Sequence, residues 1–294
     1  FVYNPSGDGI VLNGTDNVTI SNNTIEVTTS STSTLGGIPI VSRNGQYYYN
    51  GAAESNLTVT DNVLIGGYFG ISIYGSSTNR SSNVEVSGNE FSLQYYYGGY
   101  LSYVDDLEFN DNIMSSFRSS SAYGARFWYC NDLSAHENEA SGVNYGLYIY
   151  RAGGQDNEVV NNMVDANVYA LYNYFSDSVS VYHNTLRGNY GAYNFYGSNF
   201  DVRNNIFAGN TYAVYDRLGT NVNYDYNVYN SNGLYLVYTT SALSSLSAWQ
   251  SADSTQNMNS VEGDPIFISA NDLHVVGLAA SNAGDNSVGV MHDI

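Results

Sequence analysis

The fold is decided by an eight-residue phrase that first appears as VTISNNTI, from Val18 to Ile25. Its pattern is apolar, polar, apolar, two variable residues, asparagine, one variable residue and apolar. The phrase occurs nine times, with its asparagine at Asn23, Asn62, Asn89, Asn112, Asn138, Asn162, Asn184, Asn205 and Asn227. These asparagines are 21 to 39 residues apart, and a repeat of that length is typical of a solenoid in which each repeat forms one coil.

The alternation inside the phrase predicts a β-strand. Thr19 lies between Val18 and Ile20, and the equivalent second position is polar in all nine phrases. A period of two is the signature of a strand with one buried face and one wet face. Stacked about 4.8 Å apart, the asparagines of successive coils can pass amide hydrogen bonds along one ladder. The alternative is that asparagine only suits a turn, but an apolar residue two positions later in every phrase favours the ladder.

A second short strand follows a small residue in each coil, as in residues 70–73 (GISI) and 146–149 (GLYI). Two strands and three bends fill a coil of 21 to 27 residues, so no helix fits, which excludes leucine-rich and α-helical solenoids. The sequence therefore predicts an all-β parallel β-helix of about nine or more coils. We assign residues 1–230 to the β-helix repeats. Because the phrase ends after Tyr229, residues 231–294 are assigned to a C-terminal cap or a continuation of the β-helix.

The segment around and after the last phrase resembles a known family. It contains Asp225-Tyr226-Asn227, Trp249, Asp264-Pro265-Ile266-Phe267 and Asp272-Leu273-His274. Together with the repeated phrases, it is similar to right-handed parallel β-helix repeat proteins of the secreted or cell-surface type found in Bacteroidetes-like bacteria. The resemblance covers nearly the whole chain and implies a right-handed β-helix and an extracellular or cell-surface location, but its motifs specify no activity. Members usually continue past the point where this chain stops, so we expect a part of a longer protein.

The charge balance limits the partners. The chain has 27 Asp and Glu, 8 Arg, no Lys and a net charge of −19. Such a surface repels polyanions, which argues against nucleic acid, anionic membranes and acidic polysaccharides unless a cation bridges them. We expect a neutral carbohydrate or a protein partner, copies of the same chain included, and no insertion into a membrane. Cys130 is the one cysteine, so no internal disulfide can form.

Aromatic residues recur on the second strand of the coils. Counted from the small residue that opens this strand, the fourth position holds Tyr74, Tyr103, Trp128, Tyr150, Tyr174 and Phe195, and the second holds Tyr148, Tyr172, Tyr193 and Tyr215. Strand alternation turns both positions outward, opposite to the inward Ile71 and Leu147. One interpretation is that the rings only stiffen the sheet. The other, which the 30 tyrosines favour, is a face that binds sugars or a protein partner.

Three arginines lie near these aromatic positions: Arg126, Arg151 and Arg217. They can pair with acids or stack on rings, and simple surface pairing is the expected arrangement.

No catalytic residue is assigned. Glu85 and Glu108 fall on neighbouring coils, where a retaining pair is geometrically feasible, but they fit the wet column of the phrase better. Asp105 and Asp106 resemble the adjacent acids of polygalacturonase-like hydrolases, but the Gly-His-Gly and Arg-x-Lys elements of those enzymes are absent. We therefore expect no hydrolase or lyase activity on acidic polysaccharides.

No cofactor or metal is predicted. Calcium is kept as an alternative at an acidic run of oxygen ligands, Asp105, Asp106, Glu108 and Asp111, although solvated acidic loops are commoner. The histidines lack the spacing of a metal site; they are His136, His183, His274 and His292. Candidate glycosylation positions are the sequon residues Asn13, Asn17, Asn22, Asn56 and Asn79, and also Ser178 and Ser254, whose neighbours resemble the short O-glycosylation signal of Bacteroidetes secreted proteins.

These features predict an extracellular or cell-surface protein that acts through its surface. It would serve as an adhesin, a carbohydrate-binding stalk or a filament subunit, with the aromatic positions as its working face. The alternative is a polysaccharide-degrading glycoside hydrolase or lyase on a β-helix scaffold. A third interpretation is assembly alone, with the aromatic face buried between subunits.

Overall fold

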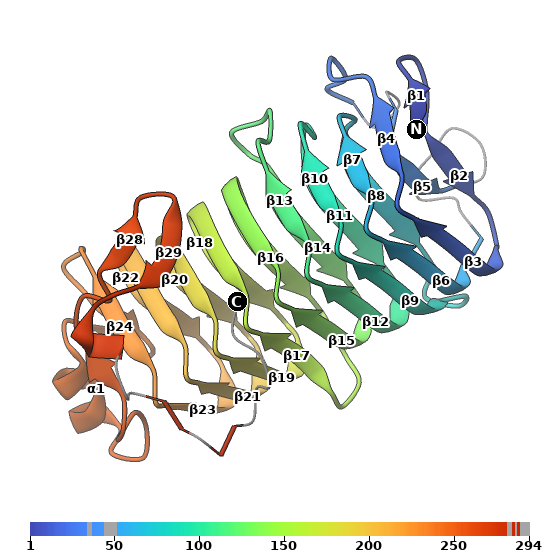
Figure 1. Cartoon of the computed structure of the whole chain (residues 1–294). Coiled ribbons are helices and arrows are strands. Elements are labelled where there is room, and N and C mark those ends of the chain that lie inside the picture. Colours follow the sequence, from blue (N-terminus) through green and yellow to red (C-terminus); the bar gives the residue numbers. More distant parts are fainter. Residues whose placement is uncertain (34–36, 44–51, 281–283, 286, 289–294) are drawn as a thin grey trace.

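The computed structural model describes residues 1–33, 37–43, 52–280, 284, 285, 287 and 288. In this part of the chain the backbone winds into coils that stack along one axis (Figure 1). Strands β1 (Val2–Asn4) and β2 (Ile10–Leu12) lie at one end of the stack, and helix α1 (Leu246–Ala252) lies at the other. Strands of successive coils pair in parallel, so the predicted parallel β-helix is confirmed.

The first half of each phrase forms one face of the coils, a nine-stranded sheet within the described residues. Its strands are β3 (Asp16–Ser21), β6 (Ser55–Thr60), β9 (Ser81–Ser87), β12 (Val104–Asn110), β15 (Asn131–His136), β17 (Asn157–Val160), β19 (Asp177–Tyr182), β21 (Ser198–Arg203) and β23 (Thr220–Asp225). The strands pair in register, so that Thr58 lies beside Glu85 of the next coil, and Glu85 lies beside Glu108. The polar positions of the phrase therefore line up along the outside.

The rest of each coil belongs to a larger sheet with two rows of strands. The first row follows the phrase asparagine and contains β1, β4 (Thr24–Val27), β7 (Val63–Ile65), β10 (Glu90–Ser92), β13 (Ile113–Ser115), β24 (Val228–Ser231) and β27 (Val261–Glu262). The second row contains β2, β5 (Ile40–Ser42), β8 (Phe69–Tyr74), β11 (Tyr97–Ser102), β14 (Tyr123–Trp128) and β25 (Val237–Tyr238). In the four coils between β14 and β24, a single long strand spans both rows. These strands are β16 (Glu139–Tyr150), β18 (Met163–Tyr174), β20 (Thr185–Phe195) and β22 (Ile206–Arg217).

Apolar side chains at the inward positions fill the interior of the coils. Val59, Val86 and Phe109 occupy the third position of three successive phrases, and all are fully buried. Burial of each such side chain stabilises the fold by roughly 1.5–3 kcal/mol. The residue that opens the second strand is small because the next coil lies close to it. A Cβ added at Gly146 would lie 2.4 Å from the carbonyl oxygen of Ala170 in the next coil.

The phrase asparagines form one column at the bend after the first sheet. The backbone N–H and Nδ2 of Asn162 both donate to Oδ1 of Asn184, at 2.9 and 2.8 Å, and Nδ2 also donates to the carbonyl oxygen of Ala135 at 2.8 Å. Equivalent bonds join successive coils from Asn23 to Asn227. The residue before each of these asparagines has a positive φ of 54 to 66°, which turns the chain sharply at this point.

The segment from residue 231 extends the sheet and covers the end of the interior. Strands β25 and β27 pair in parallel with β22 and β24, and β26 (Ala242–Leu243) pairs antiparallel with β25. Trp249 of α1 packs on Tyr224 and Tyr229, with ring centroids 5.1 and 5.5 Å apart. These contacts shield the last apolar layer from water.

A hairpin of β28 (Phe267–Ser269) and β29 (Asp272–Val275) follows, and η1 (Leu278–Ala280) comes after it. The hairpin lies against the side of the solenoid (Figure 1), where Arg187 donates to the carbonyl oxygen of Ala270. No helix in the described ranges is both long and apolar enough to cross a lipid bilayer.

Candidate ligand-binding face

The second row of the large sheet carries the predicted aromatic residues on its outside. Strand pairing places Tyr148 beside Tyr172, Tyr172 beside Tyr193, and Tyr193 beside Tyr215. We call this file of residues the middle column, which also includes Tyr238 of β25. Its rings are in contact from coil to coil, with centroids 4.5 to 5.1 Å apart.

The fourth position of the second strand forms a neighbouring file, the outer column. Trp128 stacks on Tyr150 with centroids 3.8 Å apart and planes 5° apart. Tyr150 stacks on Tyr174 at 5.5 Å, and Tyr174 stacks on Phe195 at 5.1 Å. Stacked rings at such distances contribute about 0.5–1.5 kcal/mol for each pair beyond the area that they bury.

One predicted member of the outer column is wrong. Strand pairing places Ser102, not Tyr103, between Tyr74 and Trp128. The prediction counted from Gly99 as the residue that opens the second strand. The strand pairing shows that Gly98 opens it, so the fourth position falls on Ser102. Tyr103 lies one residue later, at a bend where its φ is 53°, and its ring stacks on Tyr129 with centroids 4.8 Å apart.

The equivalent bend residues of successive coils form a third row of side chains, which we call the bend column. Its members all have a positive φ and are Tyr103, Tyr129, Arg151, Phe175, Tyr196 and Leu218. Phe175 stacks on Tyr196 at 4.8 Å, and the guanidinium of Arg151 lies 5.6 Å from the ring of Tyr129 and 5.3 Å from that of Phe175. Strand alternation does not extend through a bend, so the sequence pattern does not predict this column.

A fourth file, the inner column, was also missed. It contains Tyr123, Tyr145, Tyr169, Tyr190 and Tyr212, which pair in register across five coils. Its rings touch those of the middle column, since the centroid of Tyr169 is 4.9 Å from that of Tyr193. A sequence signal exists, because each of these tyrosines directly precedes the small residue that opens the second strand. The sheet irregularities at this point break the alternation that would otherwise turn the tyrosines inward.

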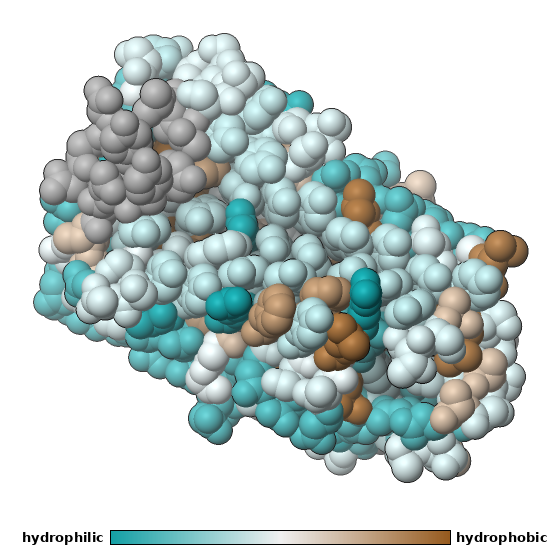
Figure 2. Space-filling view, turned by 180° about the vertical axis from the view of Figure 1, so that it is seen from behind, coloured by the Kyte–Doolittle hydropathy of each residue, from teal (hydrophilic) through white to brown (hydrophobic). Residues whose placement is uncertain are grey.

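We call the four columns together the outer aromatic face. Its predicted members are all partly buried, because neighbouring rings cover one another. Parallel stacking leaves few ring faces open, so ring edges and phenolic hydroxyls are the groups left for a ligand. Figure 2 shows the molecule from behind, where strongly apolar side chains occur as small separate groups on a pale surface.

Burial favours the neutral form of three phenols on this face. It raises the pKa of Tyr148 and of Tyr169 to about 12, and it also raises the pKa of Tyr172. Nearby tyrosines act in the same direction, because two adjacent phenolates would repel. A tyrosine phenol is already protonated at neutral pH, and burial extends this state to higher pH, so these hydroxyls can both donate and accept a hydrogen bond.

Three arginines belong to this face, and they stack on rings instead of pairing with acids as expected. Arg126 lies between Tyr100 and Tyr148 in the middle column, 4.3 Å from the ring of Trp128. Arg217 lies 5.5 Å from the ring of Phe195. Among the described residues, neither these two arginines nor Arg151 forms an ion pair, and no Asp or Glu occupies the four columns. The face is thus free of negative charge on a chain of net charge −19.

The first sheet carries a different surface feature. A polar hollow of about 350 Å³ is lined by Asn17, Thr19, Asn56, Thr58, Asn83, Val84, Glu85 and Glu108. Glu85 and Glu108 are register partners on neighbouring coils. Asp105, which adjoins Asp106 in the sequence, forms an ion pair with Arg80 at 2.6 Å and accepts a hydrogen bond from Asn131.

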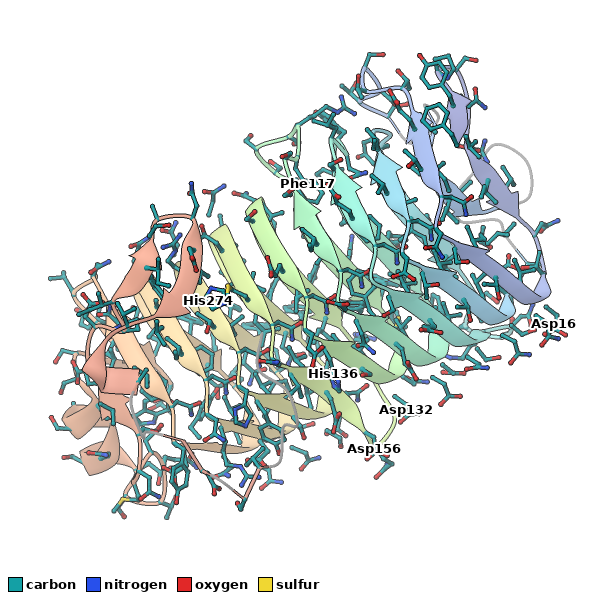
Figure 3. All side chains as sticks on the ribbon, viewed as in Figure 1. Asp16, Phe117, Asp132, His136, Asp156 and His274 are labelled. Carbon is teal, nitrogen blue, oxygen red and sulfur yellow. The ribbon has the colours of Figure 1, made fainter. Side chains whose placement is uncertain are left out.

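No group of three or more His, Cys, Asp or Glu in the described part of the chain is arranged to hold a metal ion. Figure 3 shows His136 and His274 on different elements, β15 and β29, and each contacts a different acid, Glu158 at 3.1 Å and Asp272 at 2.6 Å. His292 lies outside the described residues.

The candidate glycosylation residues differ in exposure. The sequon residues Asn13, Asn17, Asn22, Asn56 and Asn79 are all exposed. Ser254 is exposed and Ser178 is half-buried.

The comparison with family models identifies the class of protein. A model described as right handed beta helix region matches residues 8–189, which is more than half of the chain. The chain therefore belongs to the right-handed β-helix family. Adhesins and carbohydrate-active enzymes share this fold, so the family alone selects neither. A search of curated proteins and a search of solved structures each found no match.

Proposed function

We propose that the protein is an extracellular or cell-surface β-helix that binds a carbohydrate chain on its outer aromatic face. The observation that carries this proposal is the continuity of the face, whose middle column alone runs in contact from Tyr148 to Tyr238. A folded chain needs few aromatic residues on its outside, and contiguous half-exposed rings are typical of interaction surfaces.

The chemistry of the face suits a sugar polymer. Neutral phenols offer donors and acceptors to sugar hydroxyls, and the ring edges offer apolar contact to sugar C–H groups. The guanidinium groups of Arg151 and Arg217 are exposed and add further donors. A long, repeating ligand matches a surface that repeats with every coil.

We favour a neutral glycan because of the net charge of −19. Long-range repulsion slows the approach of a polyanion, including nucleic acid and an anionic membrane. The secreted, Bacteroidetes-like origin that the sequence resemblance implies agrees with an encounter with glycans outside the cell.

The test is calorimetric titration of the protein with soluble neutral polysaccharides, namely a β-glucan, a mannan and a xylan, and with pectate as an acidic comparison. The double variant Tyr148→Ala/Tyr172→Ala should weaken binding of the neutral ligand by about 1–3 kcal/mol for each ring removed. The control is Tyr3→Ala on β1, because Tyr3 is 59% exposed and lies outside the face.

The matched variant Tyr148→Phe/Tyr172→Phe separates hydroxyls from rings. It keeps both stacked rings and should cost about 0.5–1.5 kcal/mol for each hydrogen bond lost. Equal affinity of the wild type and the double alanine variant would refute binding at this face. Binding of pectate alone would refute the choice of a neutral ligand.

A second candidate is a glycoside hydrolase, and one observation favours it. Glu85 and Glu108 are register partners that line the polar hollow. Their strands lie about 4.8 Å apart, so the two carboxyl groups can reach the separation of roughly 5–5.5 Å that a retaining pair needs. Release of reducing ends from a neutral polysaccharide, abolished in both Glu85→Gln and Glu108→Gln, would establish this alternative.

A further inference from the structure

The middle column holds pairs of tyrosines in nearly parallel contact across neighbouring coils. Tyr193 and Tyr215 have ring centroids 4.7 Å apart and planes 9° apart, and Tyr215 and Tyr238 have centroids 4.5 Å apart and planes 13° apart. Both pairs are register partners in the sheet. Neighbouring backbones therefore hold the two rings of each pair nearly parallel and in stacking contact.

We propose that this column is an oxidative cross-linking site, at which Tyr193 and Tyr215 become joined through their ortho ring carbons as dityrosine. The co-reactant is hydrogen peroxide used by a haem peroxidase. Each phenol loses one electron and one proton and becomes a phenoxyl radical. The two radicals form one carbon–carbon bond, and the ring hydrogens at the joined carbons move to the oxygens, which restores both phenols. Peroxide takes up the two electrons and two protons and leaves as two water molecules.

Geometry makes the reaction intramolecular. Groups held in contact react as if present at an effective concentration far above that of another molecule in dilute solution. Both rings are half-buried, so an oxidant can reach their edges while the sheet fixes their relative position. Phe195 of the outer column stacks on Tyr193 with planes 24° apart, but a phenylalanine has no phenol to oxidise.

The same column contains a built-in comparison. Tyr172 and Tyr193 are also register partners, and their centroids are 5.1 Å apart, but their planes are at 89°. Perpendicular rings do not hold their ortho carbons opposite each other, so this pair should not couple. Tyr148 and Tyr172, with planes 9° apart at 4.6 Å, should couple as a separate pair.

A cross-link would tie one coil to the next. Tyr193 and Tyr215 are 22 residues apart in the sequence (215 − 193), so the bond closes a loop of one coil. Cys130, the one cysteine of the chain, is buried and leaves no internal disulfide for this purpose. The bond would restrict the unfolded chain as a disulfide does and raise the thermal midpoint.

The experiment treats a dilute solution of the 294-residue chain with a haem peroxidase and hydrogen peroxide, and then isolates the monomer. The expected product fluoresces as dityrosine, is lighter by two hydrogen atoms for each link, and yields a linked peptide pair containing Tyr193 and Tyr215 after digestion. Tyr215→Phe, which keeps the stacked ring, should remove this link and the link to Tyr238. Tyr172→Phe should leave both in place and remove only the link to Tyr148.

Three results would overturn the proposal. The first is dityrosine found only between molecules, for example at the exposed Tyr3. The second is undiminished coupling within the monomer of Tyr215→Phe. The third is a Tyr172–Tyr193 link formed as readily as the Tyr193–Tyr215 link, since parallel rings would then be irrelevant. None of these readouts depends on glycan binding.

Discussion

Trp128 and Tyr150 stack across neighbouring coils with centroids 3.8 Å apart and planes 5° apart. Arg126 lies 4.3 Å from the same Trp128 ring. The indole thus contacts a ring on one coil and a guanidinium on its own strand. This arrangement makes the outer aromatic face part of the packing of the fold as well as a candidate binding surface.

Replacing Trp128 by Ala should therefore lower stability. The variant loses the stack on Tyr150 and the contact with Arg126, and we expect the free energy of unfolding to fall by about 1–3 kcal/mol, below the cost of a fully buried aromatic residue. Denaturant unfolding followed by circular dichroism measures this change. Tyr150→Phe, which keeps the stack, is the control. A Trp128→Ala protein as stable as the wild type would show that the stack contributes nothing to the fold.

Replacing Asn162 by Ala should break the asparagine column at its centre. The variant keeps the bond from the backbone N–H of residue 162 to Asn184 but loses the one from Nδ2. It also leaves the backbone N–H and Nδ2 of Asn138 without their shared acceptor. Each buried group left unpaired costs about 1–3 kcal/mol, so the free energy of unfolding should fall by at least that amount.

The control for this variant is Asn223→Ala, since Asn223 is exposed and donates one surface hydrogen bond to Asp201. It should change stability by less than about 0.5 kcal/mol. Similar losses in the two variants would contradict a special role for the column.

Asp216 should make stability depend on pH. This carboxyl lies inside the solenoid, where Tyr224 and Asn194 donate to it at 3.1 and 3.0 Å, and burial raises its pKa from 3.8 to about 6. Between these two values the folded state binds more protons than the unfolded state, so stability falls as the pH rises through this window. Below about pH 4 the carboxyl is protonated and does not lower the free energy of unfolding. Above about pH 6 it is ionised and lowers the free energy of unfolding by the full amount.

Asp216→Asn removes this titration and continues the buried amide row of Asn173 and Asn194. The variant should be more stable than the wild type by about 1–3 kcal/mol at pH 7. The difference should vanish below about pH 4. Parallel pH profiles of unfolding for the two proteins would disprove the role given to Asp216.

The tyrosines of the face should make the protein sensitive to alkali. The phenols of the unfolded chain release their protons near pH 10, whereas burial raises the pKa of Tyr148 to about 12. The unfolded state therefore binds fewer protons in this window, and stability falls as the pH rises from about 10 towards 12. Absorbance of phenolate during a pH titration, with and without denaturant, measures the effect. Superimposable titrations of the folded and unfolded chain would rule it out.

Much of the fold could be predicted because the nine phrases repeat the same local pattern. Alternation within VTISNNTI sets which side chains point inward, and the fixed asparagine marks the bend. Each coil repeats this geometry, so agreement among the nine phrases supports one phase for the first strand. The same regularity located most of the middle column and outer column, since two and four residues after an opening small residue lie on one side of a strand.

The sequence by itself therefore determined the architecture, the asparagine column and most of the aromatic rows, because these depend on short, repeated patterns. The tertiary structure alone decided the position of Tyr103, the outward turn of the inner column and the stacking of Arg126 on Trp128. It also decided that Asp216 is buried in the row of Asn173 and Asn194. The physical reason is that bends, bulges and paired glycines interrupt the two-residue period. After such an interruption, only the hydrogen-bonded register between coils shows which residues point inward and which point outward.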